Sequence, residues 1–287
     1  MKYGCSCASL LLVLSTLLLG EDPSNFVTER LAAGYRFTEG PAWSKDGFLI
    51  FSDTPNDQLL KWVPGRKVEL LRQNANGASG NAFDAQGRLY TCETRTRRVT
   101  RTDKNGVVEV IADGWQGKRL NAPAGIAVSK SGHVYFTDPA FGHQSDEREL
   151  DFYGVYHIPP KGPIEVVARP AGRPHGIVLS PNGRTLYVSN ADEHNVRAYD
   201  VDRSGAVSNE RVLISKISGV PAGLCVDEKG KLYVAANGIG IYTPQGQLEH
   251  TIEMTDPVSA CAVVDVEPLT IFATSRGTVY RVHPAEE

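Results

Sequence analysis

The segment Glu39-Gly-Pro-Ala-Trp-Ser-Lys-Asp-Gly-Phe-Leu-Ile-Phe-Ser-Asp53 carries the repeat from which the fold can be predicted. It contains a short apolar strand, a turn with a glycine and a second apolar strand, with an acidic residue at each end. The same frame returns five more times, in copies that begin at Ser79, Ala124, His175, Ala222 and Ala260. Repeats of this length, with strands rather than helices inside each copy, are typical of a β-propeller.

Each copy is interpreted as four strands separated by turn sequences such as Lys45-Asp-Gly47 and Pro64-Gly65. In the first copy the expected strands cover 42–44, 48–52, 58–63 and 68–72. The last copy has sequence for three strands, so the early apolar run 26–31 is predicted to supply its fourth strand. That pairing would close the ring and remove an exposed sheet edge. The sequence therefore predicts an all-β, six-bladed propeller of four-stranded blades, forming a single domain over 21–287.

The N-terminal segment 1–20 is interpreted as a secretory signal peptide. Lys2 precedes an apolar run over 8–19, which is too short for a comfortable membrane span, and polar residues follow Gly20. An uncleaved anchor is the alternative. We expect a secreted or periplasmic protein with no membrane contact after cleavage. The formal net charge of -3 predicts no general attraction to nucleic acid, which leaves a small molecule as the expected partner.

Five cysteines become three once this segment is removed: Cys92, Cys225 and Cys261. An odd number at unrelated spacing is not a disulfide framework. Cys225 and Cys261 lie in apolar strands and are interpreted as small buried hydrophobic residues, although one disulfide remains open.

The first residues of the six copies are expected to form a ring around one mouth of the central channel, because the first strand of every blade lines that channel. Glu39 and His175 begin blades one and four, so they should face one another. The ends of the second strands form a wider ring on the same face, and they are Asp53, Glu93, Asp138, Asn190, Ala236 and Ser275. Two long connections, 114–123 and 141–153, should also lie there, where long loops tend to carry function.

Several segments resemble the gluconolactonase/regucalcin (senescence marker protein) family. They include Phe37-Thr-Glu-Gly-Pro-Ala-Trp43, Lys118-Arg-Leu-Asn-Ala-Pro123 and Val134-Tyr-Phe-Thr-Asp-Pro-Ala-Phe-Gly142. Leu150-Asp-Phe-Tyr-Gly-Val-Tyr156 and Leu179-Ser-Pro-Asn-Gly-Arg-Thr-Leu-Tyr-Val-Ser189 extend the likeness, which covers roughly 26–283. The resemblance implies a six-bladed propeller, a divalent metal, usually calcium, at the channel mouth, and hydrolysis of sugar lactones or related esters.

The chain departs from that family at the positions that would bind the metal. Glu39 is present, but the other five ring positions, where the resemblance implies Asn or Asp, are Ser79, Ala124, His175, Ala222 and Ala260. Calcium takes roughly six to eight oxygen ligands, whereas this ring offers one carboxylate, one hydroxyl, one imidazole and three methyl groups. We therefore expect a degenerate site with calcium disfavoured. A metal such as zinc, held by Glu39 and His175 with help from Asp138, Asn190 or Asp192, is left open.

The sequence thus predicts a lactonase-like hydrolase in which Glu39 and His175 act as an acid/base pair. Expected substrate contacts are Arg119, Asn121, Asp138, Asn190 and Ser79, of which Ser79 is also a weak candidate nucleophile. Three alternatives stay open. The pair could simply neutralise each other in the channel, with the strand-end Asp and Asn residues capping turns. The scaffold could run a metal-independent lyase, isomerase or condensing reaction. It could also bind a ligand without catalysis.

Overall fold

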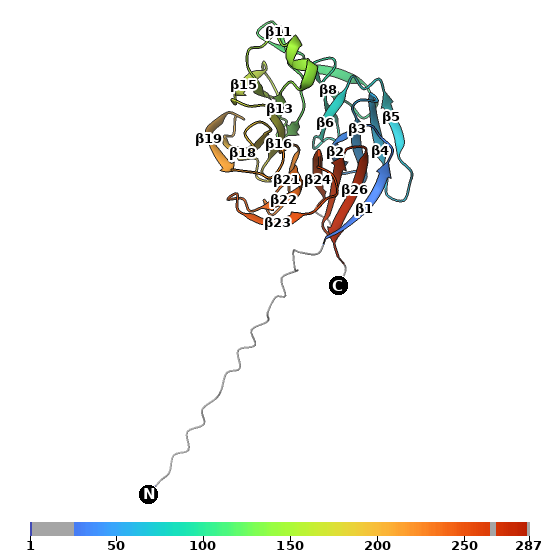
Figure 1. Ribbon diagram of the computed structural model, residues 1–287. Coiled ribbons are helices and arrows are strands. Elements are labelled where there is room, and N and C mark those ends of the chain that lie inside the picture. Colours follow the sequence, from blue (N-terminus) through green and yellow to red (C-terminus); the bar gives the residue numbers. More distant parts are fainter. Residues whose placement is uncertain (2–25, 265–267, 286–287) are drawn as a thin grey trace.

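The computed structural model describes Met1 and residues 26–264 and 268–285, and these form a six-bladed β-propeller (Figure 1). Blade one contains β2 (Thr38–Ser44), β3 (Phe48–Asp53), β4 (Gln58–Trp62) and β5 (Glu69–Gln73). Blade two contains β6 (Ala78–Phe83), β7 (Leu89–Glu93), β8 (Arg98–Thr102) and β9 (Val108–Ala112). Blade three contains β12 (Ile126–Val128), β13 (Val134–Asp138), β14 (Gly154–Ile158) and β15 (Glu165–Ala168).

Blade four contains β16 (Pro174–Leu179), β17 (Thr185–Asn190), β18 (Asn195–Val201) and β19 (Val207–Ile214). Blade five contains β20 (Leu224–Val226), β21 (Leu232–Ala236), β22 (Gly238–Tyr242) and β23 (Leu248–Ile252). Blade six contains β24 (Ala260–Val264), β25 (Thr270–Ser275), β26 (Thr278–Pro284) and β1 (Phe26–Ala33). All strand pairs within the blades are antiparallel.

The ring closes through the N-terminal strand. β1 pairs with β26 from Phe26↔Pro284 to Ala33↔Thr278, so the last blade combines both ends of the described chain (Figure 1). The predicted fold and its closure are confirmed. The expected leader, apart from Met1, lies outside the described residues. Within the described part of the chain, no helix is long and apolar enough to cross a bilayer.

The hydrophobic core lies between neighbouring blades. One cluster combines Tyr233 and Ile239 of blade five with Ile271 and Val282 of blade six, and all four are at most 1% exposed. The outer strands are more open, as the exposed Leu70 of β5 and Val110 of β9 illustrate. Burial is therefore greatest in the second strands, such as β7 and β13, in which every residue is buried, and it is lowest in the outer strands, such as β5 and β9.

A glycine after five of the six ring residues lets consecutive blades approach one another, and Cys261 follows the sixth. A Cβ on Gly80 would lie 2.2 Å from the carbonyl oxygen of Ala124, and one on Gly176 would lie 2.2 Å from that of Ala222. No side chain fits at that distance, which explains why Gly follows the first residue in most copies. Hydroxyl groups one residue before the end of four of the six second strands strengthen the same junctions. Ser52, for example, donates to the Ser79 carbonyl at 2.8 Å and Ser189 to that of Ala222 at 2.6 Å.

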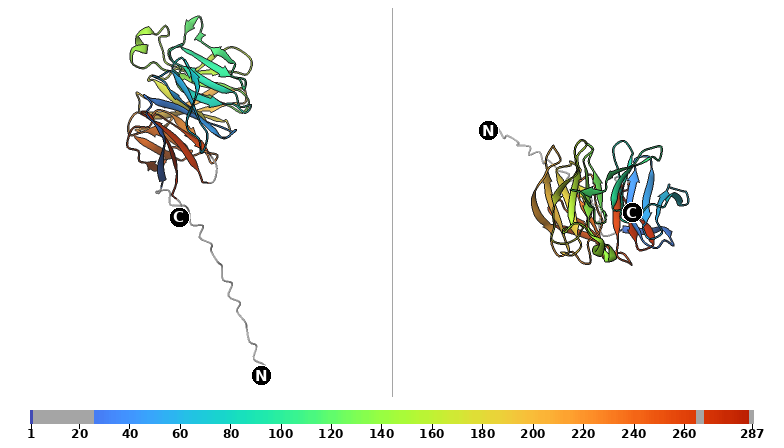
Figure 2. Two further views of the ribbon diagram at one scale, coloured as in Figure 1. Left: turned by 90° about the vertical axis from the view of Figure 1, so that its right-hand side faces the viewer. Right: turned by 90° about the horizontal axis from the view of Figure 1, so that it is seen from above.

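The two long connections lie together on one face. The first forms a small hairpin of β10 (Gly114–Trp115) and β11 (Lys118–Arg119), and the second contains the 3₁₀ helix η1 (Gly142–Glu147), which the sequence did not suggest. The Arg119 N–H donates to Glu149 at 2.9 Å, which joins the two segments. Figures 1 and 2 show η1 beside this hairpin.

Candidate active site

The first residues of the repeats meet at one mouth of the channel. Contacts between inner strands run from β2 to β6, β12, β16, β20 and β24 and back to β2, so blades one and four are opposite each other. Glu39 is the second residue of β2, and His175 is the second residue of β16. Glu39 and His175 therefore belong to the inner strands of opposite blades. Among the described contacts, no ion pair or hydrogen bond joins them.

Glu39 is surrounded by hydroxyl groups. Thr54, which follows β3, donates to Oε1 of Glu39 at 2.7 Å. The side chain retains some exposure, as expected for a group that lines a channel. Burial raises the pKa of Glu39, and hydrogen bonds from Thr54 and Ser79 oppose that rise. The result is a carboxyl group that holds its proton more tightly than a surface glutamate does.

His175 lies under an aromatic ring. The ring centroid of Phe141 is 5.1 Å from that of His175, with 55° between the planes. Burial, together with the nearby Arg173 cation, lowers the pKa of His175 to about 4. The imidazole is therefore neutral at physiological pH, with one N–H donor and one lone pair.

A layered contact holds Phe141 in place. The Arg173 guanidinium lies 4.8 Å from the Phe141 ring centroid, a cation–π geometry. Asp192 fixes Arg173 by accepting from its Nε at 3.0 Å and from its backbone N–H at 2.8 Å. Each residue thus contacts the next in the order Asp192, Arg173, Phe141 and His175.

Two residues of the wider ring, Asp138 and Asn190, stabilise loops. Both oxygens of Asp138 accept backbone hydrogen bonds, from Asn121 and Ala122, each at 2.8 Å, and burial raises the pKa of Asp138 to about 7. Oδ1 of Asn190 accepts the N–H groups of Asp192 and Glu193 at 3.2 and 3.1 Å. These contacts cap turns, which is the structural role left open for strand-end Asp and Asn residues. Direct contact with a substrate stays a prediction for both.

The remaining predicted contacts differ from one another. Asn121 is 2% exposed; its amide nitrogen donates to the carbonyls of Asp138 and Phe152, while Oδ1 has no protein partner among the described residues. Ser79 is buried beside Glu39. Arg119 is exposed and donates to the Thr96 carbonyl at 3.1 Å. None of the described contacts joins Arg119 to Glu39 or His175.

The family model described as SMP-30/Gluconolactonase/LRE-like region matches residues 37–277. The chain belongs to this family. A gluconolactonase from Zymomonas mobilis is 30% identical to it, over 88% of this chain and 80% of that protein. Rabbit regucalcin is 24% identical over 78% of this chain and 77% of its own length. The solved structure of a gluconolactonase from Xanthomonas campestris has a TM-score of 0.84 at 31% identity, covering 91% of this chain and 90% of that one.

Membership of the SMP-30/gluconolactonase family raises the question of the calcium that the resemblance implies. The six ring side chains supply one carboxylate, one hydroxyl and one imidazole, and a set this poor in oxygen does not fit calcium. Within the residues that the structure describes, no three His, Cys, Asp or Glu side chains gather as metal ligands. Any proton transfer at this mouth therefore depends on the chain's own side chains, of which Glu39 and His175 are the titratable members of the ring.

Sequence reasoning missed Thr54, Phe141, Arg173 and Asp192 as a supporting set. Thr54 lies in Asp53-Thr-Pro-Asn56, a turn sequence between two expected strands, and Phe141 begins the long connection 141–153. Asp192 was considered as an auxiliary metal ligand, yet its carboxylate pairs with Arg173. No local pattern in the sequence marks a contact between residues 141, 173 and 192.

Proposed function

We propose that this chain hydrolyses a sugar lactone or a related polyhydroxylated ester at the channel mouth without a bound calcium ion. The supporting observation is that this chain, 30% identical to a gluconolactonase, carries Glu39 and His175 on the inner strands of opposite blades. Enzymes of one fold can differ in chemistry, so the family sets the reaction class and the ring residues set the mechanism.

Glu39 is proposed as the general base. In its ionised form it takes a proton from a water molecule as the water oxygen attacks the lactone carbonyl carbon. The tetrahedral intermediate then breaks the bond between that carbon and the ring oxygen, and the departing oxygen receives the proton from Glu39. The product is a hydroxy acid, and Glu39 is regenerated. A carboxyl group with a raised pKa suits both steps, because general catalysis works best when the pKa approaches the working pH.

His175 is proposed as the hydrogen-bond donor to the carbonyl oxygen. A neutral imidazole carries an N–H group that can stabilise negative charge as it develops on that oxygen. The low pKa of His175 keeps the ring neutral, so it polarises the carbonyl without losing a proton to solvent. In this proposal Glu39 and His175 act separately on the substrate. The predicted acid/base pair would need a hydrogen bond between them, and the described contacts include none.

The decisive experiment combines elemental analysis with a pH–rate profile against a panel of lactones. We expect no stoichiometric metal and full activity after treatment with a chelator. The rate should fall as the pH drops through the pKa of Glu39, which lies above that of an ordinary glutamate, because protonation removes the base. Stoichiometric calcium whose removal abolishes turnover would refute the metal-independent proposal.

The same panel separates the alternatives. A His175→Ala variant that loses turnover but still binds a lactone would support an enzyme over a non-catalytic binding propeller. Elimination or isomerisation products, with no hydroxy acid, would support a metal-independent lyase or isomerase. If both Glu39→Gln and His175→Ala retain full activity, neither side chain carries the reaction.

A further inference from the structure

Two buried cysteines meet between blades five and six. Cys225 lies on β20 and Cys261 on β24, and their Sγ atoms are 2.7 Å apart. Non-bonded heavy atoms normally stay roughly 3.5–4.0 Å apart, so this contact is closer than packing of two thiols requires. Both residues belong to the core cluster between these blades and are 7% and 5% exposed.

The third cysteine of the described chain has different surroundings. Cys92 lies on β7, is fully buried, and its Sγ contacts the Gly125 carbonyl oxygen at 3.6 Å. Cys92 therefore provides an internal reference for a buried thiol that faces a backbone oxygen.

The N-terminal sequence adds a second, independent indication. The predicted leader would carry the chain into an oxidising compartment, where disulfides form and persist. We propose that Cys225 and Cys261 form a disulfide that joins the first strands of blades five and six when the chain folds under oxidising conditions. This inference does not depend on the proposed function.

The reaction is a thiol–disulfide exchange with a small disulfide such as oxidised glutathione. One cysteine thiolate attacks the glutathione disulfide and releases one glutathione. The second cysteine then attacks the mixed disulfide and releases the other. Two S–H bonds are lost, one Sγ–Sγ bond forms, and two protons and two electrons end on two glutathione molecules.

Burial sets the order of events. It raises the pKa of Cys225 well above its ordinary range, so little reactive thiolate exists once the blades have packed. The bond therefore forms during folding, and the packed core then shields it from reductants. It would link residues 36 positions apart and would tie blade five to the blade that holds both chain ends.

The test begins with the reduced, denatured chain and refolds it in a glutathione redox buffer. The folded protein is treated with an alkylating reagent under denaturing conditions and digested with trypsin. We expect fragment 217–229, which carries Cys225, to be linked to fragment 232–276, which carries Cys261. Cys92 should be recovered alkylated in fragment 89–95. Folded protein in which all three cysteines are alkylated, or in which glutathione adducts replace the link, would overturn the proposal.

A stability measurement complements the peptide map. Reductant present during refolding should lower the Tm of the product by roughly 5–10 °C, because the closed loop no longer restricts the unfolded chain. The Cys92→Ala variant should show the same shift, whereas the Cys225→Ala/Cys261→Ala double variant should show none. An equal shift in the double variant would also overturn the proposal, and the peptide map decides the matter if that variant fails to fold.

Discussion

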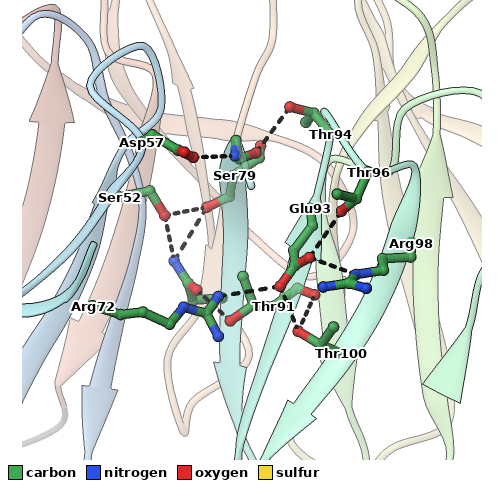
Figure 3. Close-up of polar contacts among 12 residues, drawn as sticks. Ser52, Asp57, Arg72, Ser79, Thr91, Glu93, Thr94, Thr96, Arg98 and Thr100 are labelled. Atoms are coloured by element: carbon green, nitrogen blue, oxygen red, sulfur yellow. Dashed lines mark hydrogen bonds and ion pairs between the residues drawn. The ribbon is translucent and has the colours of Figure 1, made fainter. Parts of the chain in front are cut away.

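Glu39 and Glu93 are acidic residues on neighbouring blades, and their surroundings differ sharply. Glu93, at the end of β7, is 0% exposed and accepts from Arg98 Nε at 2.7 Å, Arg72 at 3.3 Å and Thr96 at 2.8 Å (Figure 3). Glu39 accepts hydroxyl hydrogen bonds, and no cation pairs with it among the described residues. One enclosed carboxylate is neutralised by two arginines, while the other is left with a raised pKa.

The difference indicates which of the two carboxylates stabilises the fold and which can take part in a reaction. A carboxylate with two guanidinium partners is held in a fixed geometry by charge-assisted hydrogen bonds. A carboxyl group enclosed without a counter-charge is poised to gain and lose a proton, which is characteristic of catalytic acids and bases. The contrast therefore assigns Glu93 to blade stability and supports Glu39 as the reactive group, and variants of the two residues can test that assignment.

Replacement of Glu39 should give the largest effect. We expect Glu39→Gln to lower kcat/KM for a lactone by about 10³-fold, since the amide keeps the shape but cannot accept a proton. The fold should persist, because the amide can still accept the hydrogen bond from Thr54. Steady-state kinetics with a thermal melt measure both quantities. Activity within a few-fold of the parent chain would remove Glu39 from the mechanism.

Replacement of Glu93 should act on stability instead. Glu93→Gln leaves the buried part of Arg72 and Arg98 without a balancing charge, which should reduce the free energy of unfolding by about 3 kcal/mol. Burial already lowers the pKa of Arg72, and the Glu93 carboxylate offsets that effect. Urea denaturation measures the loss.

The kinetic control for this second variant is kcat per folded molecule, measured below the unfolding transition. We expect it to remain near the parent value. A variant of normal stability with lost activity would reverse the roles assigned to the two glutamates.

The fold could be predicted from the sequence because its signals are local and repeated. The X-Gly start, the turn glycine and two apolar strands recur in most copies, and each has a geometric cause such as the close approach at Gly80. The closure by β1 also followed, since the last copy lacked a fourth strand. The helix η1 did not follow, because it lies in a connection without repeat equivalents.

The site could be predicted only in its ring positions. Strand direction places Glu39 and His175 at one mouth, and the period places them on opposite blades. Their states depend on contacts from distant segments: Thr54 on Glu39, and Phe141 and Arg173 on His175. Such contacts arise from tertiary packing between loops of different blades, and no spacing in the sequence encodes them.

Replacement of Phe141 should give the smallest effect. Because Phe141 packs on His175, it tests whether this loop controls the imidazole at the channel mouth. Phe141→Ala should lower kcat about fivefold, because His175 loses the ring that restricts its orientation. Removing that cover also reduces desolvation of the imidazole, so the pKa of His175 should rise from about 4 toward its ordinary value. An NMR titration of the His175 imidazole measures that rise directly, whereas the acid limb of the pH–rate profile, which Glu39 sets, should stay in place. Phe141→Leu keeps an apolar cover and should retain most of the parent titration curve. An unchanged titration of His175 in Phe141→Ala would mean that the channel wall, and not this loop, keeps His175 neutral.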